Sequence, residues 1–134
     1  GVMDYLQRAK ELGLKLAIAS SSKKEWIEPL LTQHGIGRFF DAVITADRVE
    51  QVKPDPTLYM LALDALQVPG GEAIAIEDSV NGLKAAKAAG MYCVIVPNPV
   101  TVHLNWPVGL DDYRLTSLTA MSLDDLLALF PLEP

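Results

Sequence analysis

Residues 73–96, AIAIEDSVNGLKAAKAAGMYCVIV, carry the pattern that indicates the fold of this chain most clearly. This stretch begins with a short apolar run, 73–76, and ends with a second one, 92–96, each of the length expected for a buried strand. The segment between them is rich in alanine and stops at Gly90, which is typical of a helix that ends at a glycine. A strand, a helix and a second strand in this order predict two parallel strands joined by a crossover helix.

The same alternation of helices and strands extends in both directions along the chain. Further helical patterns cover residues 2–12, 23–34 and 57–66, and a final helix is expected after Ser122. Further strands are expected over 14–19, 42–45 and, more weakly, 112–116. Short apolar strands that alternate with helices predict the α/β class, with a doubly wound, Rossmann-like parallel sheet and helices on both of its faces.

Three residues are expected to set helix ends. Ser122 is the predicted N-cap of the final helix, and Thr57 is the predicted N-cap of the helix that runs to about Leu66. Pro29 lies inside the pattern over 23–34, where it is expected to kink the helix or to end its regular part.

Composition limits the classes of function. The 134 residues are half apolar, which suits one globular domain with a core. The 17 acidic and 11 basic residues give a net charge of −6, which argues against nucleic-acid binding by phosphate neutralisation. No apolar run approaches the roughly 20 residues of a membrane span, so no membrane association is expected. The single Cys93 excludes an internal disulfide and favours a cytoplasmic setting.

Polar residues follow the strand expected to end at Ala19. They are Ser20, Ser21, Ser22 and Lys23. Hydroxyl groups and free backbone amides at the start of a helix can hold a phosphate group. Capping of the helix by one of the serines explains the same residues equally well, and the two roles are compatible.

A lysine and two acids are the other candidates. Lys53 opens the segment KPDP, 53–56, whose two prolines fix the loop, so that the lysine could stabilise negative charge in phosphoryl transfer. Glu77 and Asp78 follow a buried strand directly, and Mg²⁺ commonly uses one or two carboxylates with phosphate oxygens and water. The plainer alternatives are a solvated Lys53, a solvated Glu77, and capping of the next helix by Asp78 or Ser79.

The carboxyl ends of parallel strands lie at one edge of a sheet, where ligands of such folds bind. A hydroxyl group, a lysine and a pair of carboxylates would therefore meet at this edge. They are the parts of a magnesium-assisted phosphoryl-transfer site.

The segments LAIASSSK, KPDP and IEDSVNGLKAAKAAGM, residues 16–23, 53–56 and 76–91, resemble the haloacid dehalogenase (HAD) superfamily. The resemblance is to its β-phosphoglucomutase-like and phosphatase branch, and it extends from Gly1 to about Pro99 and more loosely to the end. It implies a magnesium-dependent phosphatase or phosphomutase that acts on a small phosphorylated metabolite.

The resemblance also implies roles for single residues. Ser20 would bind the transferring phosphoryl group, and Lys53 would neutralise it and orient the nucleophile. Asp78 would be a Mg²⁺ ligand, with Glu77 a second ligand or a support for the first. Ser22 and Lys23 match the neighbours that hold a second phosphate in the phosphomutase members.

Two departures from the family pattern are clear. The family's first motif, DxDx[TV], carries the nucleophilic aspartate and the general acid/base, and no DxD occurs in this chain. The helical cap domain that selects the substrate is also absent. Residues 1–134 are therefore expected to be the C-terminal part of a HAD-like hydrolase core, inactive by themselves. The alternative is a non-catalytic remnant that binds phosphate or a partner.

In the family sheet, the strand of the first motif lies between the strands that end at Ser20 and Glu77. Three outcomes are possible without it. Either the missing N-terminal segment completes the sheet, or a second copy does so, or the two inner strands pair directly. Each of the three would pair backbone groups that the missing strand leaves unpaired at the inner edges.

Overall fold

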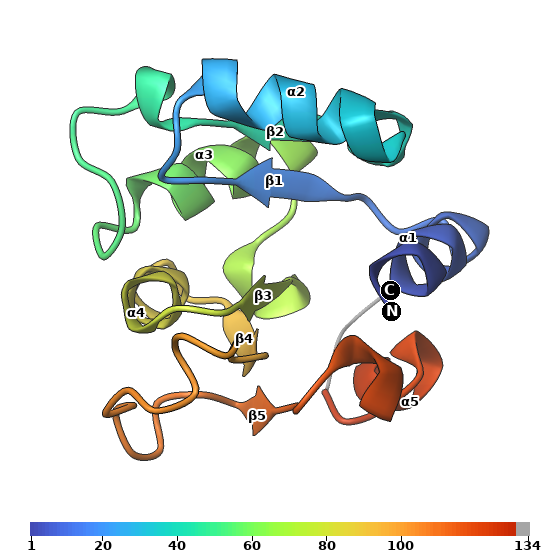
Figure 1. Ribbon diagram of the computed structural model, residues 1–134, viewed down its shortest axis with the longest axis vertical. Helices are drawn as coiled ribbons and strands as arrows, with labels where there is room; N and C mark the ends of the chain where they lie inside the picture. The colour runs from blue at the N-terminus through green and yellow to red at the C-terminus, as the bar shows by residue number, and fades with distance from the viewer. Residues whose placement is uncertain (131–134) are drawn as a thin grey trace.

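The computed structural model describes residues 1–130, in which helices alternate with parallel strands (Figure 1). The helices are α1 (Val2–Glu11), α2 (Lys24–His34), α3 (Thr57–Leu66), α4 (Val80–Ala88) and α5 (Leu123–Leu127). The strands are β1 (Ala17–Ala19), β2 (Ala42–Ile44), β3 (Ile74–Glu77), β4 (Tyr92–Ile95) and β5 (Tyr113–Arg114). The order expected from the sequence is confirmed, although most strands are shorter than expected.

The strands form two parallel sheets. β1 pairs with β2, with Ala17 opposite Ala42, and β4 lies between β3 and β5, with Ile74 opposite Tyr92 and Val94 opposite Tyr113. The α/β class with parallel strands is thereby confirmed. The strands of each sheet all run in the same direction. Their carboxyl ends therefore lie on the same side of the sheet.

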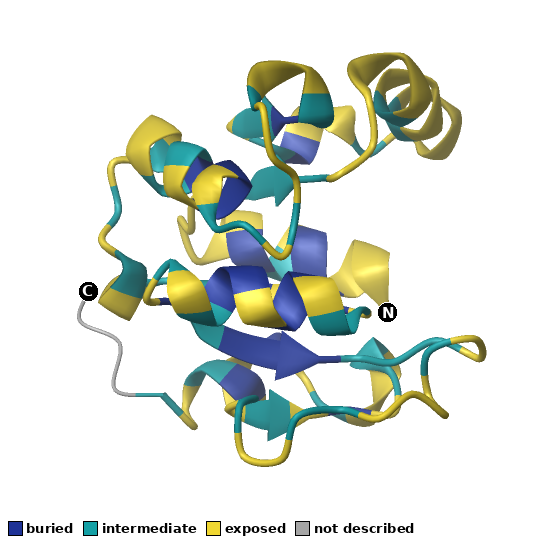
Figure 2. Cartoon of the chain, turned by 90° about the vertical axis from the view of Figure 1, so that its left-hand side faces the viewer, coloured by how far each residue is buried: buried dark blue, intermediate teal, exposed yellow. Residues whose placement is uncertain are grey.

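The central strand of the three-stranded sheet, β4, is buried on both faces, as expected for parallel strands. Cys93 and Ile95 of β4 belong to the apolar cluster that includes α4, whereas Val94 belongs to the cluster formed with α1 and α5. The two-stranded sheet differs. α3 covers one of its faces, with Leu58 against Ile44, but α2 has no buried residue and is mostly exposed (Figure 2).

The direct pairing of β1 with β3 does not occur, so that one of the three expected outcomes is wrong for residues 1–130. Helix α3 gives the physical reason. Its residues Leu58 and Ala62 pack on β1 and β2, while its Tyr59 packs into the cluster on β3 and β4. The helix thus contributes side chains to the apolar clusters of both sheets, which join without direct pairing of β1 with β3. β1 and β3 each keep a free edge, and Ile76 in the middle of β3 is 44% exposed.

One of the three predictions about helix ends is wrong, and one of the two effects expected of Pro29 is excluded. α2 continues through Pro29, so the proline does not end it. Thr57 is the first residue of α3 and not its cap, because Asp55 Oδ1 accepts a hydrogen bond from the Thr57 backbone N–H at 2.9 Å. Ser122 is confirmed as the N-cap of α5, since its Oγ accepts from the Asp125 N–H at 3.1 Å.

No helix among residues 1–130 is long and apolar enough to cross a membrane. The cytoplasmic location expected from the sequence stays a prediction.

Candidate functional site

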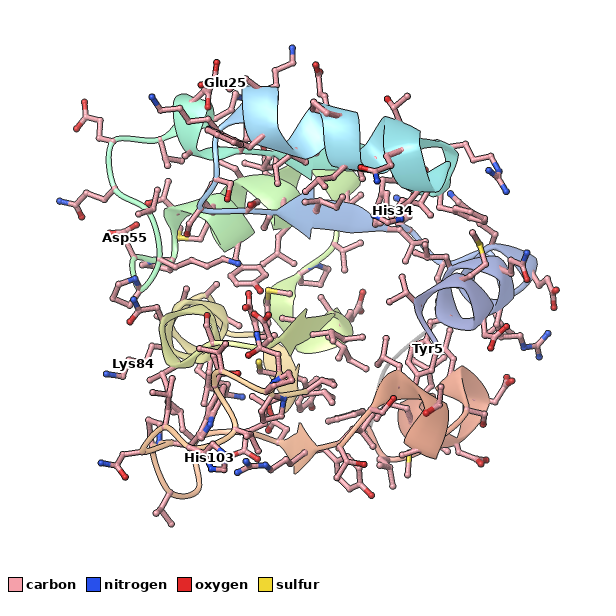
Figure 3. The ribbon with its side chains drawn as sticks, in the orientation of Figure 1. Tyr5, Glu25, His34, Asp55, Lys84 and His103 are labelled. Atoms are coloured by element: carbon pink, nitrogen blue, oxygen red, sulfur yellow. The ribbon has the colours of Figure 1, made fainter. Side chains whose placement is uncertain are left out.

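The side chain of Lys53 joins the carboxyl ends of the two sheets. Its Nζ donates to the carbonyl oxygen of Ala19, the last residue of β1, at 2.7 Å and to Oε2 of Glu77, the last residue of β3, at 2.5 Å. The same ammonium group lies 4.7 Å from the centre of the Tyr59 ring. Its loop, marked by Asp55 in Figure 3, lies on the side toward which β1 points in Figure 1. The alternative of a solvated Lys53 is wrong, because its side chain is only 11% exposed.

Glu77 is a buried carboxylate, and the expectation that it could be solvated is wrong. Its side chain is 8% exposed, and Oε2 receives hydrogen bonds from both Lys53 and the Tyr59 hydroxyl. A buried charge needs such partners, because its desolvation is otherwise costly. Burial and the nearby Glu77 charge raise the pKa of Tyr59, so its hydroxyl stays protonated and donates.

The Glu77 carboxylate lies against the first turn of α4. A Cβ atom at Gly82 would overlap with the carboxyl group of Glu77. The backbone at Gly82 is ordinary helix, so the absence of a side chain, and not an unusual dihedral angle, is what this position requires. Gly82 thus makes room for Glu77 at the edge of the sheet.

The sequence offered both Asp78 and Ser79 as caps of α4, and the structure distinguishes them. Ser79 caps α4, since its Oγ accepts from the Gly82 N–H at 3.0 Å. Asp78 is exposed and does not cap the helix. Its Oδ2 accepts instead from Nδ2 of Asn98 at 3.0 Å.

The cap at Ser79 gives a prediction about stability. Ser79→Ala and Ser122→Ala are each expected to lower the free energy of unfolding by about 1 kcal/mol, because each leaves a backbone N–H of a first helical turn without its partner. Urea denaturation followed by circular dichroism measures the change. Ser21→Ala is the control, because Ser21 is exposed and caps no helix. Equal stability of Ser79→Ala and the wild type would contradict the assignment of the cap.

None of the three serines after β1 caps α2, so that interpretation is wrong. The N-cap position is Lys23, and the first N–H of the helix, that of Lys24, donates to Oδ1 of Asp47 at 3.1 Å. Ser20 instead continues the ladder, with its N–H donating to the Ile44 carbonyl at 2.9 Å, and its Oγ accepts from the Ser22 N–H at 3.1 Å. The helix begins at Lys24, beyond the serines, and the carboxylate of the distant Asp47 accepts the hydrogen bond that a capping side chain would accept.

The structure brings only some of the predicted phosphate-binding residues together. An open hollow between the loop of Lys53 and the start of α4 is lined by Ser21, Val52, Lys53, Ser79, Val80, Asn81 and Leu104. Lys23 lines a separate hollow with Glu25, Ala46 and Asp47. The role of Ser22 and Lys23 in holding a second phosphate stays a prediction.

The donor set fits Mg²⁺ better than a transition metal. Glu77 and Asp78 are adjacent carboxylates, and no group of three or more His, Cys, Asp or Glu side chains forms a metal site in the described part of the chain. Mg²⁺ is commonly bound by one or two carboxylates and completes its shell with water and phosphate oxygens, whereas structural Zn²⁺ takes four nitrogen or sulfur ligands from the protein. The two carboxylates would therefore be its protein ligands.

Three contributing residues were not recognised in the sequence. Asn98 follows β4 at the edge where Asp78 follows β3, so the rule that selected the other candidates could have found it. Tyr59 and Gly82 gave no such signal, because an aromatic residue and a glycine in apolar helices are ordinary core residues.

Cys93 is buried as expected, and burial together with Glu77 raises the pKa of its thiol to about 12, so it stays neutral.

A family model described as haloacid dehalogenase-like hydrolase matches residues 1–96. The alternating helices and parallel strands define an α/β domain, and the chain belongs to the haloacid dehalogenase-like hydrolase family.

Relatives and solved structures agree with this assignment. The chain is 51% identical over 127 residues to "Putative phosphatase YhcW" of Bacillus subtilis (strain 168), covering 95% of this chain and 57% of that protein. It is 37% identical over 127 residues to hexitol phosphatase B of Escherichia coli (strain K12), with the same two coverages. The crystal structure of CbbY from Rhodobacter sphaeroides in complex with phosphate is 37% identical, with a TM-score of 0.86 over 94% of this chain and 57% of that one. The chain thus spans little more than half the length of these proteins.

Proposed function

We propose that this chain provides the phosphate-binding and magnesium-binding part of the active site of a phosphatase for small phosphorylated metabolites. The observation that carries the proposal is the position of the Lys53 ammonium group, which bonds the last residues of both β1 and β3, Ala19 and the carboxylate of Glu77. The names of curated relatives favour a phosphatase over a phosphomutase, because "Putative phosphatase YhcW" and hexitol phosphatase B are among them.

The residues take distinct roles in this proposal. Lys53 uses two of its three ammonium hydrogens on Ala19 and Glu77, which leaves one for a phosphoryl oxygen. Its positive charge stabilises the negative charge of the transferring group. Ser20 offers its hydroxyl group from the end of β1. Asp78 and Glu77 would hold Mg²⁺, which when bound neutralises phosphate oxygens as a Lewis acid.

The proposed enzyme needs a further segment. This chain contains no DxD, and the free edges of β1 and β3 would accept one extended strand between them. We propose that the strand with the nucleophilic aspartate comes from an N-terminal segment of a longer protein, and that residues 1–134 alone are inactive. A second copy is the alternative source of a strand, but it would bring no DxD.

Complementation tests this proposal. Hydrolysis of p-nitrophenyl phosphate with Mg²⁺ is measured for the purified chain, and then with the part of the B. subtilis relative that lies outside the matched region. No turnover is expected for the chain alone and turnover for the mixture, lost in Asp78→Asn. Turnover by the chain alone that is lost in Asp78→Asn would contradict its inactivity. If the two parts associate but the mixture does not hydrolyse the substrate, the proposed phosphatase activity is wrong.

A non-catalytic phosphate-binding module is the second candidate, and the lack of a DxD in the chain favours it. Titration calorimetry with inorganic phosphate separates the two. Phosphate binding by a mixture that has no turnover supports the module, whereas turnover supports the enzyme.

A further inference from the structure

The side-chain amide of Asn98 has a fixed orientation. Its Oδ1 accepts hydrogen bonds from the backbone N–H groups of Val100 and Thr101, both at 2.9 Å. An amide nitrogen could not accept these bonds, so the oxygen must face the turn and Nδ2 must face outward. Nδ2 then donates to Oδ2 of Asp78 at 3.0 Å. The direction of this bond therefore follows from the turn.

The backbone around Asn98 is also held in place. Pro97 and Pro99 flank it, and prolines restrict both their own backbone angles and those of the preceding residue. The Asn98 N–H donates to Oγ1 of Thr101 at 2.9 Å, and Nε1 of Trp106 donates to the Thr101 carbonyl at 2.9 Å. Little freedom is thus left for the amide group.

The turn alone does not explain an asparagine at this position. Asparagine and aspartate both form such turns through a side-chain oxygen. The Nδ2 group takes no part in the turn, and its partner is Asp78. An aspartate at position 98 could form the turn but would set a second negative charge against Asp78.

We propose that Asn98 is a positioning residue that holds the Asp78 carboxylate by one oxygen and leaves Oδ1 for Mg²⁺. The inference rests on the magnesium site of the proposed function. Asp78 is exposed, so its side chain would otherwise rotate freely and would have to be ordered when the ion binds. Hydrogen bonds to ligating carboxylates act in this way, and their loss typically weakens metal binding about 10–100-fold.

The test uses the 134-residue chain and Mn²⁺ as a spectroscopic probe for Mg²⁺, with affinity measured by water-proton relaxation. Asn98→Ala is expected to bind Mn²⁺ about 10–100-fold more weakly than the wild type. Thr101→Val is the matched control, because it removes a bond of the same turn and leaves Nδ2 and Asp78 unchanged. It is expected to bind Mn²⁺ as the wild type does.

A second measurement detects the hydrogen bond between Asn98 and Asp78 in the absence of metal. The NMR signals of the Asn98 side-chain NH₂ are expected to shift in Asp78→Ala, while the backbone amide signals of Val100 and Thr101 stay in place. Unmoved NH₂ signals, or equal Mn²⁺ affinity in Asn98→Ala and the wild type, would overturn this inference alone. A wild-type chain that binds no Mn²⁺ would overturn the proposed magnesium site and the inference with it.

Discussion

Replacing Lys53 with methionine is expected to lower the free energy of unfolding by about 3–5 kcal/mol, because it leaves Glu77 as a buried charge without its ion-pair partner. Methionine keeps much of the length of the side chain but removes the charge and the bonds to Ala19 and Glu77. The Tyr59 hydroxyl remains as a neutral donor, which compensates only part of the loss. The variant is also expected to lose affinity for inorganic phosphate. Urea denaturation and titration calorimetry measure the two effects.

Lys84→Met is the matched control for this experiment, because Lys84 is an exposed lysine on α4. It is expected to change stability little. The double variant Lys53→Met with Glu77→Gln is expected to recover much of the stability, since the buried charge is then gone and Gln can still bond to Tyr59. If Lys53→Met is as stable as Lys84→Met, the ion pair does not support the fold.

Gly82→Ala is expected to destabilise the chain, although alanine is the better helix former. Helix propensity alone would add roughly 0.5–1 kcal/mol of stability. The new methyl group would overlap with the Glu77 carboxylate, and inserting atoms into a packed site costs about 1–3 kcal/mol. The collision also pushes Glu77 away from Lys53 and Tyr59, which adds to the loss. The steric cost is therefore expected to win, with phosphate affinity reduced as well.

Gly71→Ala is the control for the glycine experiment. A Cβ atom at Gly71 meets nothing within 4 Å, so this change is expected to be nearly neutral. Thermal denaturation of the two variants and the wild type measures the difference. A Gly82→Ala variant that is more stable than the wild type would mean that Glu77 does not occupy the space beside the helix.

The sequence predicted what local patterns determine. Two strands and the helix between them lie where the apolar runs 73–76 and 92–96 and the alanine-rich segment indicated. Strands of a parallel sheet are buried on both faces, so they are built from short apolar runs that can be recognised in a sequence. The common edge of the strands then predicted that Lys53 and Glu77 would be neighbours. Their direct bond, between residues 24 positions apart, is a finding of the structure and was not predicted.

The errors concern contacts that no local pattern contains. Asp47 reaches the start of α2 from 23 residues away, whereas the local pattern offered only the nearer serines as possible caps. The burial of Glu77 could have been noticed, since it shares a strand face with the buried Ala75. The separation of β1 from β3 depends on how α3 packs on both sheets, which is a property of the assembled fold.

The free edges of β1 and β3 also affect how the chain behaves at high concentration. Unpaired backbone N–H and C=O groups can form hydrogen bonds with any other extended chain, and the exposed Ile76 adds apolar surface beside them. Only three and four residues long, these edges are short, and the net charge of −6 makes molecules repel one another. Colloidal stability of the isolated chain thus depends on a balance between edge-to-edge aggregation and electrostatic repulsion. Added salt, which screens that repulsion, shifts the balance toward aggregation.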